Sequence, residues 1–251
     1  MPPGQPAKLA GGLFTGNFFM IRLYQFPAGF DVPNVSPFCL KLETFMRLAG
    51  VQYQVRALRD PRKAPKGKLP YIDFDGELIA DSAIIQRVLT ERLHLELDQH
   101  LDAEARGRAV AVTRLCDDHL YWLLVYFRWL EPEGWQQTRQ AFFGHLGPAL
   151  LTLITPLIQR RVRADLSAQG FARHEREDLL TFAREDLQAL TDLLGDAPFF
   201  GGDHPCSADA SAYGVLANLV FCSLQTPLNR LAREYPVLVD YCQRLRAVAW
   251  A

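Results

Sequence analysis

Residues 67–82, GKLPYIDFDGELIADS, carry the clearest local pattern in the chain. The stretches YIDF and ELIA have the composition of two short strands. Asp75-Gly76 between them is one of the dipeptides that most strongly predict a two-residue hairpin turn. We therefore expect an antiparallel hairpin over this segment.

The residues on either side of the hairpin extend the pattern. Leu69-Pro70 stands at the entrance of the first strand, where a proline removes one hydrogen-bond donor from the sheet. Asp81 and Ser82 follow the second strand, and both side chains favour the N-terminus of a helix. We expect this helix to run to about Leu93.

The chain before the hairpin predicts a strand, a helix and a second strand. Residues 21–26, IRLYQF, alternate as a strand does. Ser36 and Pro37 are favoured at the start of a helix, and apolar residues at helical spacing follow as far as Gly50. Residues 51–55, VQYQV, predict another strand, whereas the segment RDPRKAPKGK is too broken by proline for a solid helix. The predicted order is β-α-β-loop-β-β-α.

From about Asp102 onward the pattern changes to long helical periodicities. Glycine and proline separate predicted helices over residues 104–130, 135–145, 149–168, 174–194, 208–224 and 236–247. We therefore expect a flexible leader over residues 1–19, a small α/β domain over 20–95 and an all-helical domain over 102–251.

Composition excludes several classes of function. A net charge of −1 provides no strongly basic surface for nucleic acid or an anionic membrane. The five cysteines are scattered without a Cys-x-x-Cys pair, which favours free thiols in a reducing cytoplasm. Cys116 and His119 have C-x-x-H spacing, but two ligands do not make a zinc site, so we expect no metal. No apolar run reaches the roughly 18 residues that a transmembrane helix needs.

Several motifs together resemble a known superfamily. The order β-α-β-β-β-α, with SPFC opening the first helix and Leu69-Pro70 entering the third strand, resembles the thioredoxin fold. With a helical domain attached, the chain looks like a soluble glutathione transferase. The segments SPFCLKLETFMRLAG, KGKLPYIDFDGELIADSAII and LGDAPFFGGDHPCSADASAYG resemble the failed-axon-connections and metaxin-like branch, from about residue 21 to the end.

This resemblance implies a binding site for glutathione as co-substrate. In the family the bond before the proline at position 70 is cis, which turns the backbone N–H and C=O of Leu69 toward an extended peptide such as glutathione. A hydroxyl and backbone N–H groups at a helix N-terminus bind an anion. Ser82 is therefore expected to hold the γ-glutamyl carboxylate, and Asp81 is expected to help hold the amine.

The second helix of the thioredoxin unit is expected to be reduced to the segment RDPRKAPKGK. That helix normally helps to bind the glycyl end of glutathione. Lys66 or Lys68 could supply the positive charge there instead, although solvated lysines explain the same residues.

The resemblance also suggests where the chemistry occurs. The reaction requires the glutathione thiolate, and a hydroxyl that donates to the sulfur beside a helix N-terminus lowers the pKa of the thiol. Ser36 stands where serine-type transferases carry the activating serine. Cys39, one helical turn later, is the other candidate for catalysis, at the position of the second cysteine of a redox pair. Helix capping and burial are the structural alternatives for these two residues.

The helical domain is expected to supply the pocket for the second substrate. Tyr121, Trp122 and Tyr126 form an aromatic run at near-helical spacing, and apolar pockets of this kind accept hydrophobic electrophiles. The same run is also typical of a core-facing helix. His119 and Arg128 lie close by in the sequence and are assigned no role.

Two further expectations follow from the resemblance. The segment PCSADASAY matches the start of a buried helix of the family, so Asp209 is expected to bond back to the cap and to act in folding. Cys206 stands at the cap position, where Ser207 could substitute for it. A homodimer is implied by analogy with the family.

Three functions remain open from the sequence. The first is a glutathione transferase that conjugates glutathione to a small hydrophobic electrophile, with Ser36 activating the thiol. The second is a non-catalytic interaction module that keeps the fold of the failed-axon and metaxin type. The third is a glutathione-dependent reductase that uses Cys39.

Overall fold

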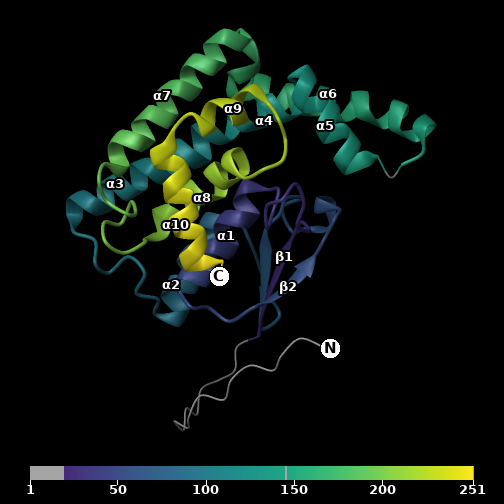
Figure 1. The fold of residues 1–251 in the computed structure, drawn as a ribbon. Helices are drawn as coiled ribbons and strands as arrows, with labels where there is room; N and C mark the ends of the chain where they lie inside the picture. The colour runs from purple at the N-terminus through teal and green to yellow at the C-terminus, as the bar shows by residue number, and fades with distance from the viewer. Residues whose placement is uncertain (1–19, 145, 251) are drawn as a thin grey trace, which may run out of the picture.

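The computed structural model describes residues 20–144 and 146–250. The predicted leader, residues 1–19, lies outside the described residues. Figure 1 shows a small sheet, with β1 and β2 labelled, below a larger group of helices. The predicted combination of a thioredoxin-like domain and a helical domain is confirmed.

The small domain is built around one four-stranded sheet of order β2-β1-β3-β4. The strands β1 and β2 are parallel, and the other two pairs are antiparallel. The elements are β1 (Ile21–Gln25), α1 (Pro37–Leu48), β2 (Gln54–Ala57), β3 (Tyr71–Phe74), β4 (Glu77–Ala80) and α2 (Ser82–Leu93). The hairpin at Asp75-Gly76 forms as predicted, and both of these residues have positive φ.

The segment between β2 and β3 contains only a 3-10 turn, Pro61–Lys63. The expectation of a reduced second helix is therefore correct. The strand predicted over residues 51–55 is displaced, because the pairing with β1 begins at Gln54 and continues to Ala57. Val51 is instead buried in the core between the sheet and α1.

The helical domain begins with one long helical stretch that is interrupted by a π-helical segment, Leu115–Leu120. The further elements are α3 (Ala103–Arg114), α4 (Tyr121–Trp129), α5 (Pro132–Phe143), α6 (Pro148–Gln169), α7 (Arg176–Leu194), α8 (Ser207–Val220), α9 (Pro227–Arg233) and α10 (Pro236–Ala249). In Figure 1, α5 and α6 project from the other helices. No helix within the described part of the chain is both long and apolar enough to cross a membrane.

One sequence-based expectation for this domain is wrong. The sequence pattern leaves residues 225–235 as a connection between two predicted helices, but a further helix, α9, begins there at Pro227. Thr226 caps this helix by accepting a hydrogen bond from the backbone N–H of Asn229. Proline is tolerated in a first helical turn because its missing N–H would have no partner there.

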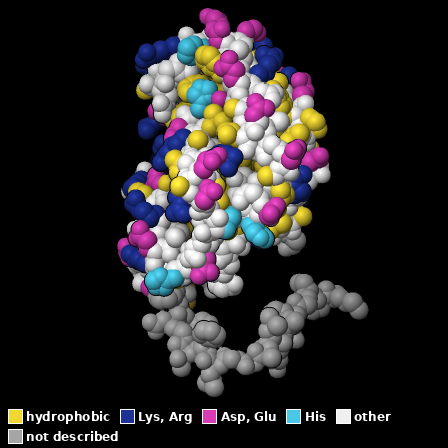
Figure 2. All heavy atoms as spheres, turned by 90° about the vertical axis from the view of Figure 1, so that its left-hand side faces the viewer, with side chains coloured by type: hydrophobic (Ala, Val, Ile, Leu, Met, Phe, Trp, Pro, Cys, Tyr) yellow, Lys and Arg dark blue, Asp and Glu magenta, His cyan; other side chains and the backbone are white. Residues whose placement is uncertain are grey.

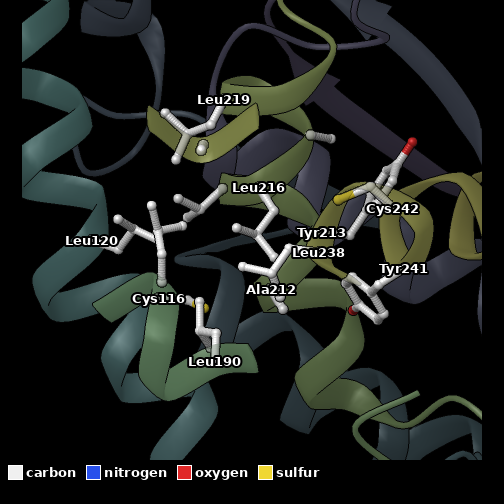
Figure 3. Close-up of a cluster of buried hydrophobic side chains, with 14 of the residues drawn as sticks. Cys116, Leu120, Leu190, Ala212, Tyr213, Leu216, Leu219, Leu238, Tyr241 and Cys242 are labelled. Atoms are coloured by element: carbon white, nitrogen blue, oxygen red, sulfur yellow. The ribbon is translucent and has the colours of Figure 1, made fainter. Parts of the chain in front are cut away.

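Helix α8 forms the centre of the helical domain, and every residue from Ala208 to Val220 is buried. Figure 3 shows its side chains among those of neighbouring helices, including Leu120, Leu190 and Leu238. A helix that is apolar all round can exist in a soluble domain only when other elements enclose it completely. The first domain supplies one of these elements, α1.

Asp209 fixes the start of α8. Its carboxylate accepts hydrogen bonds from the backbone N–H groups of Cys206 and Phe200, both at 2.8 Å, and from the Tyr241 hydroxyl at 3.0 Å. The predicted bond back to the cap is therefore present. Ser207 does not replace Cys206 as the cap, because its hydroxyl donates to Asp98 at 2.6 Å.

The two domains meet where α1 packs against α8. A Cβ atom added to Gly214 of α8 would lie 2.6 Å from the Pro37 carbonyl oxygen and 3.1 Å from the backbone nitrogen of Lys41. These are contacts with backbone, which cannot move aside as a flexible side chain can. Only glycine therefore permits this approach of the two helices.

We predict that Gly214→Ala lowers the free energy of unfolding by roughly 1–3 kcal/mol, the usual effect of overpacking a core. Urea denaturation of the full chain measures this change. Gly107→Ala in α3 is the matched control, because a Cβ at that position meets nothing within 4 Å. Alanine should leave the stability there unchanged or raise it by up to about 1 kcal/mol. Equal effects of the two substitutions would contradict the proposed close packing.

His119 in the π-helical segment forms an ion pair with Asp186 of α7, with 2.6 Å between Nδ1 and a carboxylate oxygen. The hydrogen bond to Asp186 raises the pKa of His119, and burial raises the pKa of Asp186. Both folded-state pKa values are therefore above those of the unfolded chain. The stability contributed by the pair is present at low pH and is lost as the pH rises through the folded-state pKa of His119.

We predict that His119→Gln lowers the melting temperature more at about pH 6 than at about pH 9, because the imidazolium exists only at the lower pH. Thermal unfolding followed by circular dichroism measures the difference between variant and unaltered protein. His174→Gln is the control, since no carboxylate of the described residues pairs with His174. A penalty for His119→Gln that is constant with pH would show that packing, rather than charge, accounts for the contact.

Candidate functional site

Three connections of the small domain meet at one end of the sheet. In the register, Tyr71 at the start of β3 lies opposite Tyr24 near the end of β1 and opposite Ala80 at the end of β4. The loop after β1 leads to Ser36 and α1, and β4 leads directly to α2. The N-termini of α1 and α2 and the residues before β3 therefore gather at the same end.

A small hydrophobic cluster connects these pieces. Cys39, Ala64, Leu69, Tyr71 and Ala80 are buried together. The rings of Tyr24 and Tyr71 stack with centroids 4.4 Å apart. This shared packing holds the segment before β3 against the first turn of α1.

The bond between Leu69 and Pro70 is cis, as the resemblance implied. Both residues are buried. The backbone N–H and C=O of Leu69 form no hydrogen bond with any other described residue. These two groups are therefore available to an extended peptide, which is the role predicted for them.

Asp81 and Ser82 lie side by side but differ in their contacts. Asp81 is exposed, has a φ of 89°, and accepts hydrogen bonds from the N–H groups of Ala83 at 3.0 Å and Ile84 at 3.1 Å. Ser82 is buried, and its hydroxyl has no hydrogen-bond partner in the part of the chain that the structure describes. Asp81 is thus already engaged as the cap of α2, whereas Ser82 has a hydroxyl to offer a ligand.

Lys68 and Lys66 are exposed and form no ion pair with other described residues. They follow the 3-10 turn that replaces the second helix and precede Leu69. Both ammonium groups can therefore reach an anion near Leu69, and the choice between the two lysines stays open.

Ser36 is the N-cap of α1. Its hydroxyl oxygen accepts a hydrogen bond from the backbone N–H of Cys39 at 3.5 Å. Its own N–H donates to the Asn34 side chain at 3.0 Å. A hydroxyl that accepts from the backbone keeps its hydrogen for donation, so Ser36 can donate to an anionic sulfur.

Cys39 is completely buried. Burial raises the pKa of its thiol to about 12, although hydrogen bonds to Ser36 and to the backbone of Phe26 act in the opposite direction. The thiolate is the reactive form of cysteine, so this environment disfavours the redox role predicted as one alternative.

The loop before Ser36 is held by side chains of the helical domain. The Arg128 guanidinium donates to the Val35 carbonyl at 2.7 Å, and the Asn218 amide donates to the Asn34 carbonyl at 3.1 Å. The sequence assigned no role to Arg128 and did not single out Asn218. The signal that could have identified Arg128 and Asn218 is that each is a polar residue within an apolar helical segment.

The predicted aromatic pocket is brought together only in part. Tyr121 packs against Phe38 in the first turn of α1, with centroids 4.6 Å apart, and its ring also contacts Trp122. Tyr126 is five positions further along the helix, which turns it about 140° away from Tyr121. Burial raises the pKa of the Tyr126 hydroxyl, and Arg163 of α6 and Arg176 of α7 act in the opposite direction.

A separate cavity of about 630 Å³ lies between the loop after β1, α5 and the connection between α8 and α9. It is lined by Phe30, Gln136, Arg139, Gln140, Ser223 and Leu224, among others. None of the predicted pocket residues lines this cavity. The hydrophobic substrate site therefore stays a prediction based on Tyr121 and Trp122.

The surface charges are mixed in sign. Figure 2 shows Lys and Arg side chains interspersed with Asp and Glu on the face that it displays. No group of three or more His, Cys, Asp or Glu side chains within residues 20–144 and 146–250 is arranged to hold a metal ion.

Comparison with known families agrees with this architecture. Residues 37–134 match the glutathione S-transferase N-terminal domain, and residues 183–245 match the glutathione S-transferase C-terminal domain. In a glutathione S-transferase of Ceriporiopsis subvermispora, solved in complex with glutathione, the same fold covers 91% of this chain and 96% of that one. The TM-score is 0.62 and the sequence identity is 16%.

Two curated relatives are more similar in sequence. Failed axon connections of Drosophila melanogaster is 33% identical over 98% of this chain, and the chain spans 61% of that protein's length. Metaxin-1 sequences match as well, so the predicted branch is confirmed. Isoprene-epoxide–glutathione S-transferase of Rhodococcus sp. is 31% identical over 90% of this chain and 98% of its own length. The chain therefore belongs to the glutathione S-transferase family.

Proposed function

We propose that this chain binds glutathione and activates its thiol for conjugation to a small hydrophobic electrophile. The observation that carries the proposal is the meeting of the Ser36 cap, the unpaired backbone of Leu69 and the Ser82 hydroxyl at one end of the sheet. Two helix N-termini at one place favour a ligand with several negative charges, and glutathione is such a ligand.

In the proposed reaction the Ser36 hydroxyl donates a hydrogen bond to the glutathione sulfur, and the N-terminus of α1 adds a favourable dipole. Together they stabilise the thiolate, and the proton of the thiol passes to water. The sulfur then attacks a carbon of the electrophile, so that a C–S bond forms as the bond to the leaving oxygen or halide breaks. The name of the Rhodococcus relative supports an epoxide as one class of electrophile.

Tyr121 and Trp122 are proposed to contact the electrophile, because Tyr121 packs beside the first turn of α1. A homodimer and a cytoplasmic location also belong to this proposal. The cytoplasmic location is supported by the five cysteines, all of which are free thiols.

A non-catalytic interaction module is the second candidate. The 3-10 turn at Pro61–Lys63 supports it, since it stands where a helix would help to bind the glycyl end of glutathione. The 33% identity to Failed axon connections is compatible with this candidate. Measurement of glutathione binding separates the two functions.

We predict that calorimetric titration with reduced glutathione gives a micromolar to low-millimolar dissociation constant and that Ser82→Ala weakens it at least tenfold, which corresponds to about 1.4 kcal/mol. The loss arises because the γ-glutamyl carboxylate would lose a charge-assisted hydrogen bond. Ser167→Ala in α6, far along the chain from the site, should bind as the unaltered protein does. Absence of heat and of any thermal shift in the unaltered protein would favour the interaction module.

We predict that Ser36→Ala lowers kcat/KM for conjugation to an epoxide or aryl halide by roughly 100-fold, as loss of a transition-state donor does. Ser36→Thr, which keeps both hydroxyl and cap, should retain most of the activity. Circular dichroism must confirm that both variants fold, because loss of a cap costs about 1 kcal/mol. Unchanged conjugation by Ser36→Ala would remove this serine from the mechanism.

A reductase that uses Cys39 is the least supported function, because its thiol is buried and mostly protonated. We predict that iodoacetamide at neutral pH leaves Cys39 unmodified in the native protein, as measured by mass spectrometry. The same reagent in denaturant should modify all five cysteines, which serves as the control. Rapid labelling of Cys39 in the folded protein would revive the redox function.

A further inference from the structure

Arg128 is a buried cation between the two domains. It lies in α4 with 5% of its surface exposed, facing the loop before α1 on one side and α8 on the other. No carboxylate among the described residues forms an ion pair with it. Burying an unpaired charge costs free energy of folding, so we expect this arginine to have a function that offsets the cost.

The oxygen atoms that accept hydrogen bonds from the guanidinium are those of a backbone carbonyl and a side-chain amide, not of a carboxylate. It donates to the Val35 carbonyl at 2.7 Å and to the Asn218 side chain at 3.2 Å, and it lies 4.0 Å from the Cys222 sulfur. Carbonyl dipoles orient a cation without cancelling its charge. The full positive charge therefore acts on its surroundings through a medium of low dielectric constant.

The Val35 carbonyl belongs to the same peptide unit as the Ser36 N–H. That N–H donates to the Asn34 side chain, while Asn218 holds the Asn34 carbonyl. Arg128 and Asn218 also contact one another. The helical domain thus fixes, through two side chains, the peptide from which the Ser36 hydroxyl projects.

We propose that Arg128 is the positioning residue of the Ser36 site and that its unpaired charge stabilises the thiolate of bound glutathione. This inference rests on the proposed function. The guanidinium contacts the peptide just before the N-cap of α1, so its positive charge adds to the positive end of the helix dipole. An arginine suits this place because it remains protonated even when burial lowers its pKa.

Two titratable side chains face the guanidinium, and neither is a carboxylate. Cys222 faces it from the end of α8, and Tyr121 faces it from α4. Burial raises the pKa of Tyr121 to about 12, so this phenol is neutral at neutral pH. Cys39, which lies near the site, is neutral because burial raises the pKa of its thiol. The negative charge of Asp165 in α6 also raises the pKa of Tyr121.

The test is a pH titration of the thiolate absorbance of glutathione bound to the full chain, together with kcat and KM for conjugation. Arg128→Gln should raise the apparent pKa of the bound thiol by about one unit and lower kcat near neutral pH by roughly tenfold. Arg128→Lys should keep the pKa of the bound thiol, since the charge is retained. It should nevertheless lower kcat, because a single ammonium lacks the fork that joins Val35 to Asn218.

Arg233→Gln is the matched control. Arg233 also donates to backbone carbonyls, those of Val220 at the end of α8 and of Cys222 just after it, but forms no hydrogen bond with the described loop before α1. This variant should leave the pKa of the bound thiol and kcat unchanged.

Four outcomes overturn part or all of the inference. An unchanged thiol pKa in folded Arg128→Gln would refute the electrostatic role. If that variant does not fold, a raised thiol pKa in Arg128→Lys would refute the same role. Full kcat in Arg128→Lys would refute the positioning role. No thiolate absorbance in the unaltered protein would instead refute the proposed function, and this inference with it.

Discussion

The contact between α1 and α8 is the constraint on which the rest of the structure depends. Gly214 allows the two backbones to approach so closely that any other residue would collide with the Pro37 carbonyl. Because α1 carries Ser36 at its N-terminus, this contact also sets where the helical domain stands relative to the site. The core of one domain and the chemistry of the other are therefore fixed by the same interface.

Buried polar groups give this interface its specificity. Lys41 of α1 pairs with Asp117 of the π-helical segment across this interface. Each of these groups would be costly without its partner, so alternative packings of the two domains are disfavoured. Arg128 differs because no carboxylate of the described residues pairs with it, and it donates instead to the loop that presents Ser36 and to Asn218.

The candidate site combines strong local order with groups that have no partner. Asp81 is committed to capping α2, whereas the Ser82 hydroxyl and the Leu69 backbone form no hydrogen bond with other described residues. Groups of this kind cost stability unless water or a ligand binds them. An anionic peptide such as the proposed ligand, glutathione, would satisfy all of them at once.

The sequence by itself determined the features that depend on neighbouring residues. The hairpin at Asp75-Gly76, the caps at Ser36 and Asp81 and the helical periodicities all arise from local backbone preferences. Tertiary structure alone decided that Tyr121 reaches α1 and that Arg128 touches a loop 93 residues earlier in the chain. Such contacts depend on how two helices pack, and no short segment of sequence encodes that geometry.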